Sequence, residues 1–136
     1  MTENDEEMTL WFDGASKSNP GKAGAGWVLK KGDVIEKRGG RYLGIATNNE
    51  AEYAGLTEGL KYVRKRYPKL RSIHVRGDSM LVLNQASGKW KCQANNLKPC
   101  LKRVHSLIEG LTVDWMYVPR KHNREADACA NEAIPP

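Results

Sequence analysis

Four acidic side chains stand where the sequence changes from one kind of segment to another. Each ends an apolar run or begins a helical segment: Asp13, Glu52, Asp78 and Asp127. A carboxylate is costly to bury in such surroundings unless a positive charge meets it. Because hard divalent cations such as Mg²⁺ bind carboxylate oxygens, the four positions together indicate a divalent metal site.

The charge of the remaining chain indicates a polyanionic partner. The sequence holds 22 Lys and Arg against 16 Asp and Glu, a net charge of +6. Four of the acids fall within residues 1–7, which we expect to be a disordered acidic tail, and without them 12 acids face 22 bases, or +10. A solubilising surface fits this charge as well as nucleic-acid binding does, and the carboxylates favour the second.

The bulk composition indicates one domain. At 136 residues, with 40% apolar and 28% charged residues, the chain is long enough for a single core and contains no apolar run of membrane-spanning length. No signal or transit peptide is visible at the acidic start. The three cysteines form no CxxC pair, which argues against a disulfide framework or a zinc site and predicts an intracellular, reducing compartment.

The elements that must position the carboxylates follow from the apolar periodicity. We expect strands over residues 8–13, 25–29, 34–42, 71–77 and 112–118, and helices over residues 48–66, 79–85, 97–108 and 123–133. The stretch 16–26, with several glycines and a proline, is predicted to be a turn-rich connection, and 119–122 a loop.

The helix predicted over residues 48–66 carries one carboxylate on its buried side. Thr47 and Glu50 fit a capping box at its start, and Pro68 ends it. Its sheet-facing stripe recurs at helical spacing and comprises Glu52, Leu56, Leu60 and Val63.

The order of elements predicts an α/β fold. Three strands followed by alternating helices and strands favour a five-stranded mixed sheet, first antiparallel and then parallel, with helices on both faces. Asp13 and Asp78 then lie at the carboxyl ends of strands, where open α/β sheets place their sites.

At these positions the chain resembles the type 1 ribonuclease H family, over residues 8–134, which we take as the catalytic domain. The matching segments are Phe12-Asp13-Gly14, Asn19-Pro20-Gly21, Thr47-Asn48-Asn49, Ala51-Glu52-Tyr53, Gly77-Asp78-Ser79, Gly88-Lys89-Trp90, Val118-Pro119-Arg120 and Asn123-Arg124-Glu125-Ala126-Asp127. The short region after Trp90 is similar to the plant, archaeal and some bacterial members, which lack an extended basic protrusion.

The resemblance implies an endoribonuclease that hydrolyses the RNA strand of RNA–DNA hybrids and leaves 5′-phosphate and 3′-hydroxyl ends. It implies the ribonuclease H-like fold and two Mg²⁺ ions, for which Mn²⁺ is a substitute because it accepts the same oxygen ligands. By this resemblance Asp13 bridges the two ions. Asp127 holds the ion that activates water, and Glu52 and Asp78 hold the ion on the leaving-group side.

The resemblance also implies residues that bind the substrate. Asn19, Asn48 and Asn49 are expected in the minor groove, where they would read the 2′-hydroxyls of RNA. Thr47, with Asn95 or Asn96, is expected to hold a phosphate of the DNA strand, in addition to its role as helix cap. Trp90, with Lys89 and Lys91, would form a shortened DNA-strand channel, although packing at the helix break explains this tryptophan nearly as well.

Two features differ from better-known members of the family. His122 lies only five residues before Asp127, out of register with the family's mobile histidine, so we interpret it as a solvated loop residue. The chain shows no N-terminal hybrid-binding module, and we therefore expect a monomer of low processivity or one part of a larger protein.

Two other functions fit the same fold. A catalytically silent binding or scaffolding module usually lacks one or more of the metal ligands, whereas this chain has all four carboxylates. A nuclease of the same superfamily that cleaves DNA would not need the asparagines expected to read 2′-hydroxyls. Both alternatives are separated from the hybrid-specific enzyme by a cleavage assay.

Overall fold

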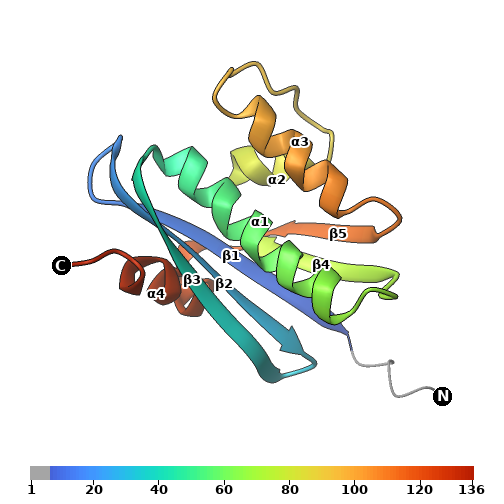
Figure 1. Ribbon diagram of the computed structural model, residues 1–136. Helices are drawn as coiled ribbons and strands as arrows, with labels where there is room; N and C mark the ends of the chain where they lie inside the picture. The colour runs from blue at the N-terminus through green and yellow to red at the C-terminus, as the bar shows by residue number, and fades with distance from the viewer. Residues whose placement is uncertain (1–6) are drawn as a thin grey trace.

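Three antiparallel strands form one half of the sheet. The computed structural model describes residues 7–136, in which β1 (Met8–Ser16) pairs with β2 (Gly21–Lys31), and β2 pairs with β3 (Val34–Ala46) (Figure 1). The turn between β2 and β3 falls at the predicted place, and Gly32 adopts the positive φ of 59° that such a turn favours.

Two parallel strands complete the sheet on the other side of β1. β4 (Ser72–Gly77) pairs with β1, and β5 (Thr112–Tyr117) pairs with β4, which gives the order β3-β2-β1-β4-β5. The predicted five-stranded mixed sheet is confirmed. Trp11 of β1 lies opposite Arg76 of β4, so the residues two positions further on, Asp13 and Asp78, emerge at the same edge.

Helices cover both faces of the sheet, as predicted. α1 (Asn48–Arg66), α2 (Met80–Ala86) and α3 (Lys98–Leu107) lie on one face, whereas α4 (Arg124–Glu132) lies on the other, against β1 and β2 (Figure 1). A single 3₁₀ turn, η1 (Arg120–His122), occupies the loop before α4. None of the helices within residues 7–136 is long and apolar enough to cross a membrane.

The hydrophobic core lies between α1 and the sheet. Leu10 and Phe12 of β1 and the predicted stripe residues Leu56, Leu60 and Val63 of α1 are all fully buried. Each such side chain contributes about 1.5–3 kcal/mol through removal from water. The core therefore fixes α1 on β1, and its first turn meets the sheet near Asp13.

The predicted turn-rich connection over residues 16–26 is wrong. β1 continues to Ser16, and β2 already begins at Gly21. A side chain at Gly26 would place its Cβ 2.3 Å from the backbone nitrogen of Ala130 in α4. Glycine occurs inside a strand where another backbone approaches closely, so this glycine marks helix packing rather than a turn.

The other boundaries differ less. β3 extends to Ala46 instead of residue 42, with irregular pairing to β2 on the way, and most of the predicted helices shift by one or two residues at their ends. The predicted disordered tail falls mainly on residues 1–6, which lie outside the described residues. Glu7, which the prediction included, accepts a hydrogen bond at its carbonyl from the Gly32 amide at 2.8 Å.

Candidate metal centre

Asp13 lies at the middle of the site, on the central strand β1. Its side chain is only 3% exposed, and its Oδ1 accepts a hydrogen bond from the Gly14 amide at 2.9 Å. Gly26, the residue of β2 that pairs with Asp13, packs against α4. Because paired residues point to the same side of a sheet, Asp13 faces the α4 side.

Glu52 reaches the same place from near the start of α1. The predicted capping box is present: Glu50 donates its amide to Thr47 Oγ1 at 3.1 Å, and Thr47 donates its amide to Glu50 Oε1 at 2.8 Å. A Cβ at Gly14 would lie 2.3 Å from the backbone nitrogen of Glu52, so only glycine lets β1 and α1 touch here. This contact brings Glu52 next to Asp13.

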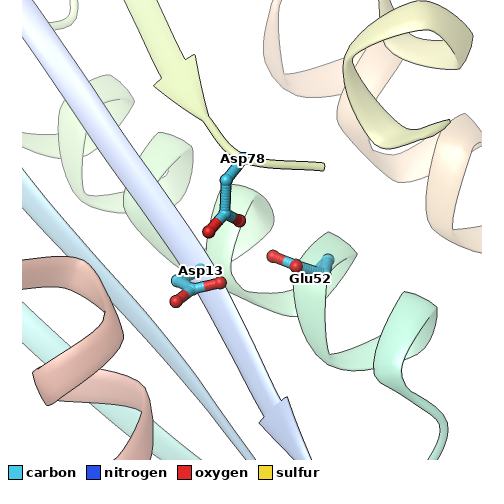
Figure 2. Close-up of side chains that lie close together, drawn as sticks. All are labelled: Asp13, Glu52 and Asp78. Atoms are coloured by element: carbon cyan, nitrogen blue, oxygen red, sulfur yellow. The ribbon is translucent and has the colours of Figure 1, made fainter. Parts of the chain in front are cut away.

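The structure brings three of the four predicted carboxylates together. Asp13, Glu52 and Asp78 each offer one oxygen, and these oxygens all lie within 4.8 Å of one another. Figure 2 shows the three side chains converging from β1, from α1 and from the end of β4. Residues far apart in the sequence thus form one compact acidic group, which we call the carboxylate trio.

Burial raises the pKa of all three carboxyl groups, and repulsion within the trio adds to this rise for Asp13 and Glu52. Burial, with repulsion from Asp78, raises the pKa of Asp13 to about 7. Burial, followed by repulsion from Asp13 and Asp78, raises the pKa of Glu52 to about 10. Burial also raises the pKa of Asp78, and the nearby positive charge of Arg120 opposes the shift. The surrounding residues therefore supply too little positive charge to balance the three carboxylates in their ionised form.

The trio fits a hard divalent cation. Within residues 7–136, Asp13 Oδ2 and Glu52 Oε1 are buried and have no hydrogen-bond partner, and such oxygens are costly unless a ligand meets them. Every ligand atom in the trio is a carboxylate oxygen, without His or Cys. This set suits Mg²⁺ or Mn²⁺ rather than zinc.

Asp127 lies beside the trio but outside its compact group. It stands in the first turn of α4, and it raises the pKa of Asp13 through their side-chain contact. Its Oδ1 also accepts a hydrogen bond from Asn131 Nδ2 at 3.1 Å. The predicted quartet is thus a trio with a fourth carboxylate next to it, on a separate helix.

Sequence reasoning gave no role to two residues that the structure places at the site. Asn123 is 2% exposed, and its Nδ2 donates to the Phe12 carbonyl at 2.8 Å, which ties the start of α4 to β1. Arg120 is exposed, and its positive charge counteracts the rise in the pKa of Asp78. Both lie in segments that matched the family, but nothing in the sequence shows which atoms they would contact.

The predicted minor-groove residues lie together at the start of α1. Asn19 Oδ1 accepts a hydrogen bond from the Asn48 amide at 3.0 Å, and Asn19, Asn48 and Asn49 are all exposed. The loop before β2 therefore brings Asn19 to the helix start, although 29 residues separate it from Asn48. Their role in substrate binding stays a prediction.

The residues predicted to contact the DNA strand lie at the start of α1 and in the loop between α2 and α3. Thr47 caps α1, and the side chain of Asn96 contributes to holding the pKa of Glu50 below its usual value, after the larger effect of the Thr47 amide. Asn95 is exposed, and Trp90 is 49% exposed in the loop between α2 and α3. His122 is exposed, as the interpretation of a solvated loop residue requires.

Comparisons with known proteins agree with this geometry. The family model described as "Reverse transcriptase-like" matches residues 11–133. The chain is 43% identical to Ribonuclease HI of Halobacterium salinarum, over 91% of this chain and 62% of that protein. The chain thus spans about six tenths of the length of the curated relatives that it matches first.

Solved structures show the same fold. The crystal structure of RNase H1 from Halobacterium salinarum superposes with a TM-score of 0.86 at 41% identity, over 93% of this chain and 96% of that one. A structure of LC11-RNase H1 in complex with RNA/DNA hybrid gives a TM-score of 0.89 at 29% identity, over 94% of this chain and 96% of that one. By sequence, by fold and by the carboxylates that its strands bring together, the chain belongs to the type 1 ribonuclease H family.

Proposed function

We propose that this chain is an endoribonuclease that hydrolyses the RNA strand of RNA–DNA hybrids. The observation that carries the proposal is the carboxylate trio, with its oxygens within 4.8 Å and two of them buried without a partner. The family membership supports the reaction, and LC11-RNase H1 has been crystallised with an RNA/DNA hybrid. The basic net charge of +6 suits a polyanionic substrate.

The four carboxylates could together hold two Mg²⁺ ions. Asp13 is central and would contact both ions, with Asp127 on one side and Glu52 and Asp78 on the other. When bound, the ions lower the pKa of a water molecule and stabilise negative charge on the leaving oxygen. Mn²⁺ is expected to substitute, because it accepts the same oxygen ligands.

The proposed reaction adds one water molecule across a phosphodiester linkage. The water oxygen forms a bond to phosphorus, and the bond between phosphorus and the 3′ oxygen breaks. The phosphate stays on the 5′ end, and the leaving 3′ oxygen takes up a proton. Near the scissile linkage the trio supplies negative charge, so cations elsewhere on the protein are needed to hold the neighbouring phosphates, and Lys89 and Lys91 are exposed.

Selection of the hybrid would rest on residues around the start of α1 and in the loop between α2 and α3. Asn19, Asn48 and Asn49 would read 2′-hydroxyls, Thr47 with Asn95 or Asn96 would hold a DNA-strand phosphate, and Trp90 would pack on DNA sugars. The four acidic residues come from one chain, which supports a monomer as the catalytic unit.

The experiment that tests this function uses Mg²⁺ with four end-labelled substrates: an RNA–DNA hybrid, double-stranded RNA, double-stranded DNA and single-stranded RNA. Internal cuts confined to the RNA of an RNA–DNA hybrid are expected, with 5′-phosphate and 3′-hydroxyl ends. Binding of the hybrid without any cut would point to a silent binding module. Cleavage of double-stranded DNA would point to a different nuclease of the superfamily, and cleavage of single-stranded RNA would contradict hybrid selection. Cleavage should also weaken steeply with salt, because the contacts are mostly to phosphates.

A further inference from the structure

α4 begins beside a small cavity, and two of the residues that line it each hold a buried polar atom that is unpaired within residues 7–136. The cavity has a volume of about 20 Å³ and is lined by Trp11, Lys30, His122, Asn123, Glu125 and Ala126. In the part of the chain that the structure describes, Trp11 Nε1 and Asn123 Oδ1 are buried and have no hydrogen-bond partner. The first is a donor and the second an acceptor, so one small molecule between them could satisfy both.

Asn123 is held firmly enough to keep its oxygen in place. Its side chain is 2% exposed, and its Nδ2 donates to the carbonyl of Phe12 at 2.8 Å. Phe12 immediately precedes Asp13 on β1. With the amide nitrogen fixed on β1, the amide oxygen of Asn123 has a defined direction within the protein interior.

Charged groups from β2 and α4 meet at the cavity. Lys30 Nζ on β2 pairs with Glu125 Oε1 on α4 at 3.0 Å. The same Lys30 Nζ lies 5.3 Å from the centre of the Trp11 ring, a cation–π distance. These contacts join β1, β2 and α4 around the two unpaired atoms and limit their access to bulk solvent.

We propose that one water molecule occupies this cavity and bridges Trp11 Nε1 to Asn123 Oδ1, and that this bridge positions α4. A buried water needs about 10–15 Å³ of accessible space and at least two polar partners, and the cavity supplies both. A bridging water is nearly as favourable as a direct hydrogen bond. Trp11 and Asn123 are therefore positioning residues, which act on the site through Asp127.

The path from this bridge to the site is short. The backbone amide of Asp127 donates to the carbonyl of Asn123 at 3.0 Å, and α4 has no side-chain hydrogen bond that caps its start. One residue thus contacts β1 next to Asp13 through its side chain and contacts Asp127 through its backbone. Loss of the bridge should let Asp127 move relative to Asp13, without change in the exposed residues that bind substrate.

This inference rests on the proposed function, because it assigns Asp127 to the metal site. Two variants test it on the full chain. Trp11→Phe keeps an aromatic side chain but replaces the indole by a smaller phenyl ring without the N–H, whereas Asn123→Ala removes the whole side-chain amide. Trp115→Phe is the matched control, since Trp115 is a half-buried tryptophan on β5, away from α4.

Kinetics separate positioning from binding. Asn123→Ala should lower kcat and raise the Mg²⁺ concentration for half-maximal activity, by about 10-fold to 100-fold as for residues that orient metal ligands, with KM for the hybrid unchanged. Trp11→Phe should lower kcat by roughly 3-fold to 10-fold, the equivalent of one lost hydrogen bond. Mg²⁺ should also raise Tm less in both variants than in the wild type or Trp115→Phe.

Nuclear magnetic resonance tests the water itself and does not depend on activity. The indole N–H signal of Trp11, assigned by its absence in Trp11→Phe, should show a cross-peak to a bound water and slow hydrogen exchange. Trp90, which is 49% exposed, is the internal reference. Exchange of the Trp11 signal as fast as that of Trp90 would overturn the bridge, even if Asn123→Ala fails to fold.

Failure of this inference is distinct from failure of the proposed function. A wild-type protein that cleaves no hybrid would remove the proposed function, while the Trp11 signal would still report on the bridge. A wild type that cleaves hybrid, together with a Trp11→Phe variant of unchanged kcat and Mg²⁺ requirement, would overturn the positioning role alone.

Discussion

The two faces of the sheet hold their carboxylates by different means. On the α1 side, Glu52 meets Asp13 because backbone touches backbone at Gly14, with the fully buried core directly behind. On the α4 side, Asp127 stands on a helix of 9 residues, and Asn123 is the side chain that ties its start to β1. Both helices approach the sheet closely at a glycine, α1 at Gly14 and α4 at Gly26, but only the α1 side adds the large apolar core, whereas the α4 side adds small buried residues and the Asn123 hydrogen bond.

The largest effect should come from a change of Asp13, the carboxylate that both sides of the site share. Asp13→Asn removes the central negative charge and should lower Mg²⁺-dependent cleavage by about a thousandfold or more, since metal stabilisation is worth several kcal/mol. Asp127→Asn should also abolish cleavage. Binding of the hybrid, measured by fluorescence anisotropy, should survive in both variants because phosphate contacts dominate it.

Near-wild-type turnover in either variant would remove that residue from the metal site. If Asp13→Asn is inactive while Asp127→Asn retains measurable cleavage, the contrast between the rigid trio and the separately held Asp127 becomes sharper. Loss of hybrid binding in both would instead indicate that the carboxylates support the fold of the binding surface.

The next effect concerns the packing behind each side. Leu60 is fully buried between α1 and β1, so Leu60→Ala should lower the free energy of unfolding near the upper end of about 2–5 kcal/mol. Ile134 is 6% exposed and lies just beyond α4. Ile134→Ala should lower the free energy of unfolding by an amount near the lower end of that range. Chemical denaturation measures both, and equal losses would contradict the view that the α4 side is held more loosely.

The same contrast explains what the sequence could and could not predict. The α1 side has strong local signals: the capping box at Thr47, the apolar stripe and Pro68 all agree, and the helix was predicted with its observed bounds. The α4 side depends on contacts between distant segments. Gly26 indicates a turn when read locally, but in the structure it lies inside β2, where it lets α4 approach.

The site also has a part that the sequence predicts and a part that it does not. Asp13, Glu52 and Asp78 were predicted to meet because strand ends and a helix start share one sheet edge, and the structure places their oxygens within 4.8 Å. The part played by Asn123 could not be predicted, because it depends on one hydrogen bond across 111 residues. The place of Asp127 beside the trio could not be predicted either, because the docking of α4 on the sheet sets it and the local sequence pattern does not.

A smaller effect should appear as a gain in stability. In metal-free protein, the folded state raises the pKa of Glu52 to about 10 from an ordinary value of about 4.3 in the unfolded chain. Below pH 4 the Glu52 carboxyl group is protonated in both states, so its raised pKa does not lower the stability. As the pH rises from there toward 10, the unfolded state ionises first, so stability falls across that window.

Glu52→Gln should therefore stabilise the metal-free protein at pH 8 by about 0.5–2 kcal/mol, as changes at strained functional sites commonly do. The gain should vanish near pH 4 and should diminish when Mg²⁺ stabilises the wild type. Thermal unfolding in chelator at several pH values measures this, and Glu58→Gln, on the same helix but away from the trio, is the control. A variant less stable than the wild type at pH 8 would show that Glu52 is not strained.

The smallest effect tests a connection between the two sides. Arg120, in the turn that leads to α4, opposes the rise in the pKa of Asp78 that burial causes at the end of β4. Without this charge, Asp78 holds its proton to higher pH, so Arg120→Ala should lose activity on the acidic limb of the pH–rate profile and recover it as the pH rises. The loss should be roughly twofold to fivefold near pH 6, because the guanidinium is exposed and screened, and 0.5 M salt should reduce it.

Lys121→Ala is the matched control, since Lys121 is the next exposed cation in the same turn. A loss of kcat/KM that is equal at every pH in Arg120→Ala would show that the guanidinium binds a substrate phosphate instead of tuning Asp78. A pH-dependent loss would show that the loop before α4 balances the charge of the rigid trio. In that case docking of α4 would affect the site twice, through the position of Asp127 and through the charge that reaches Asp78.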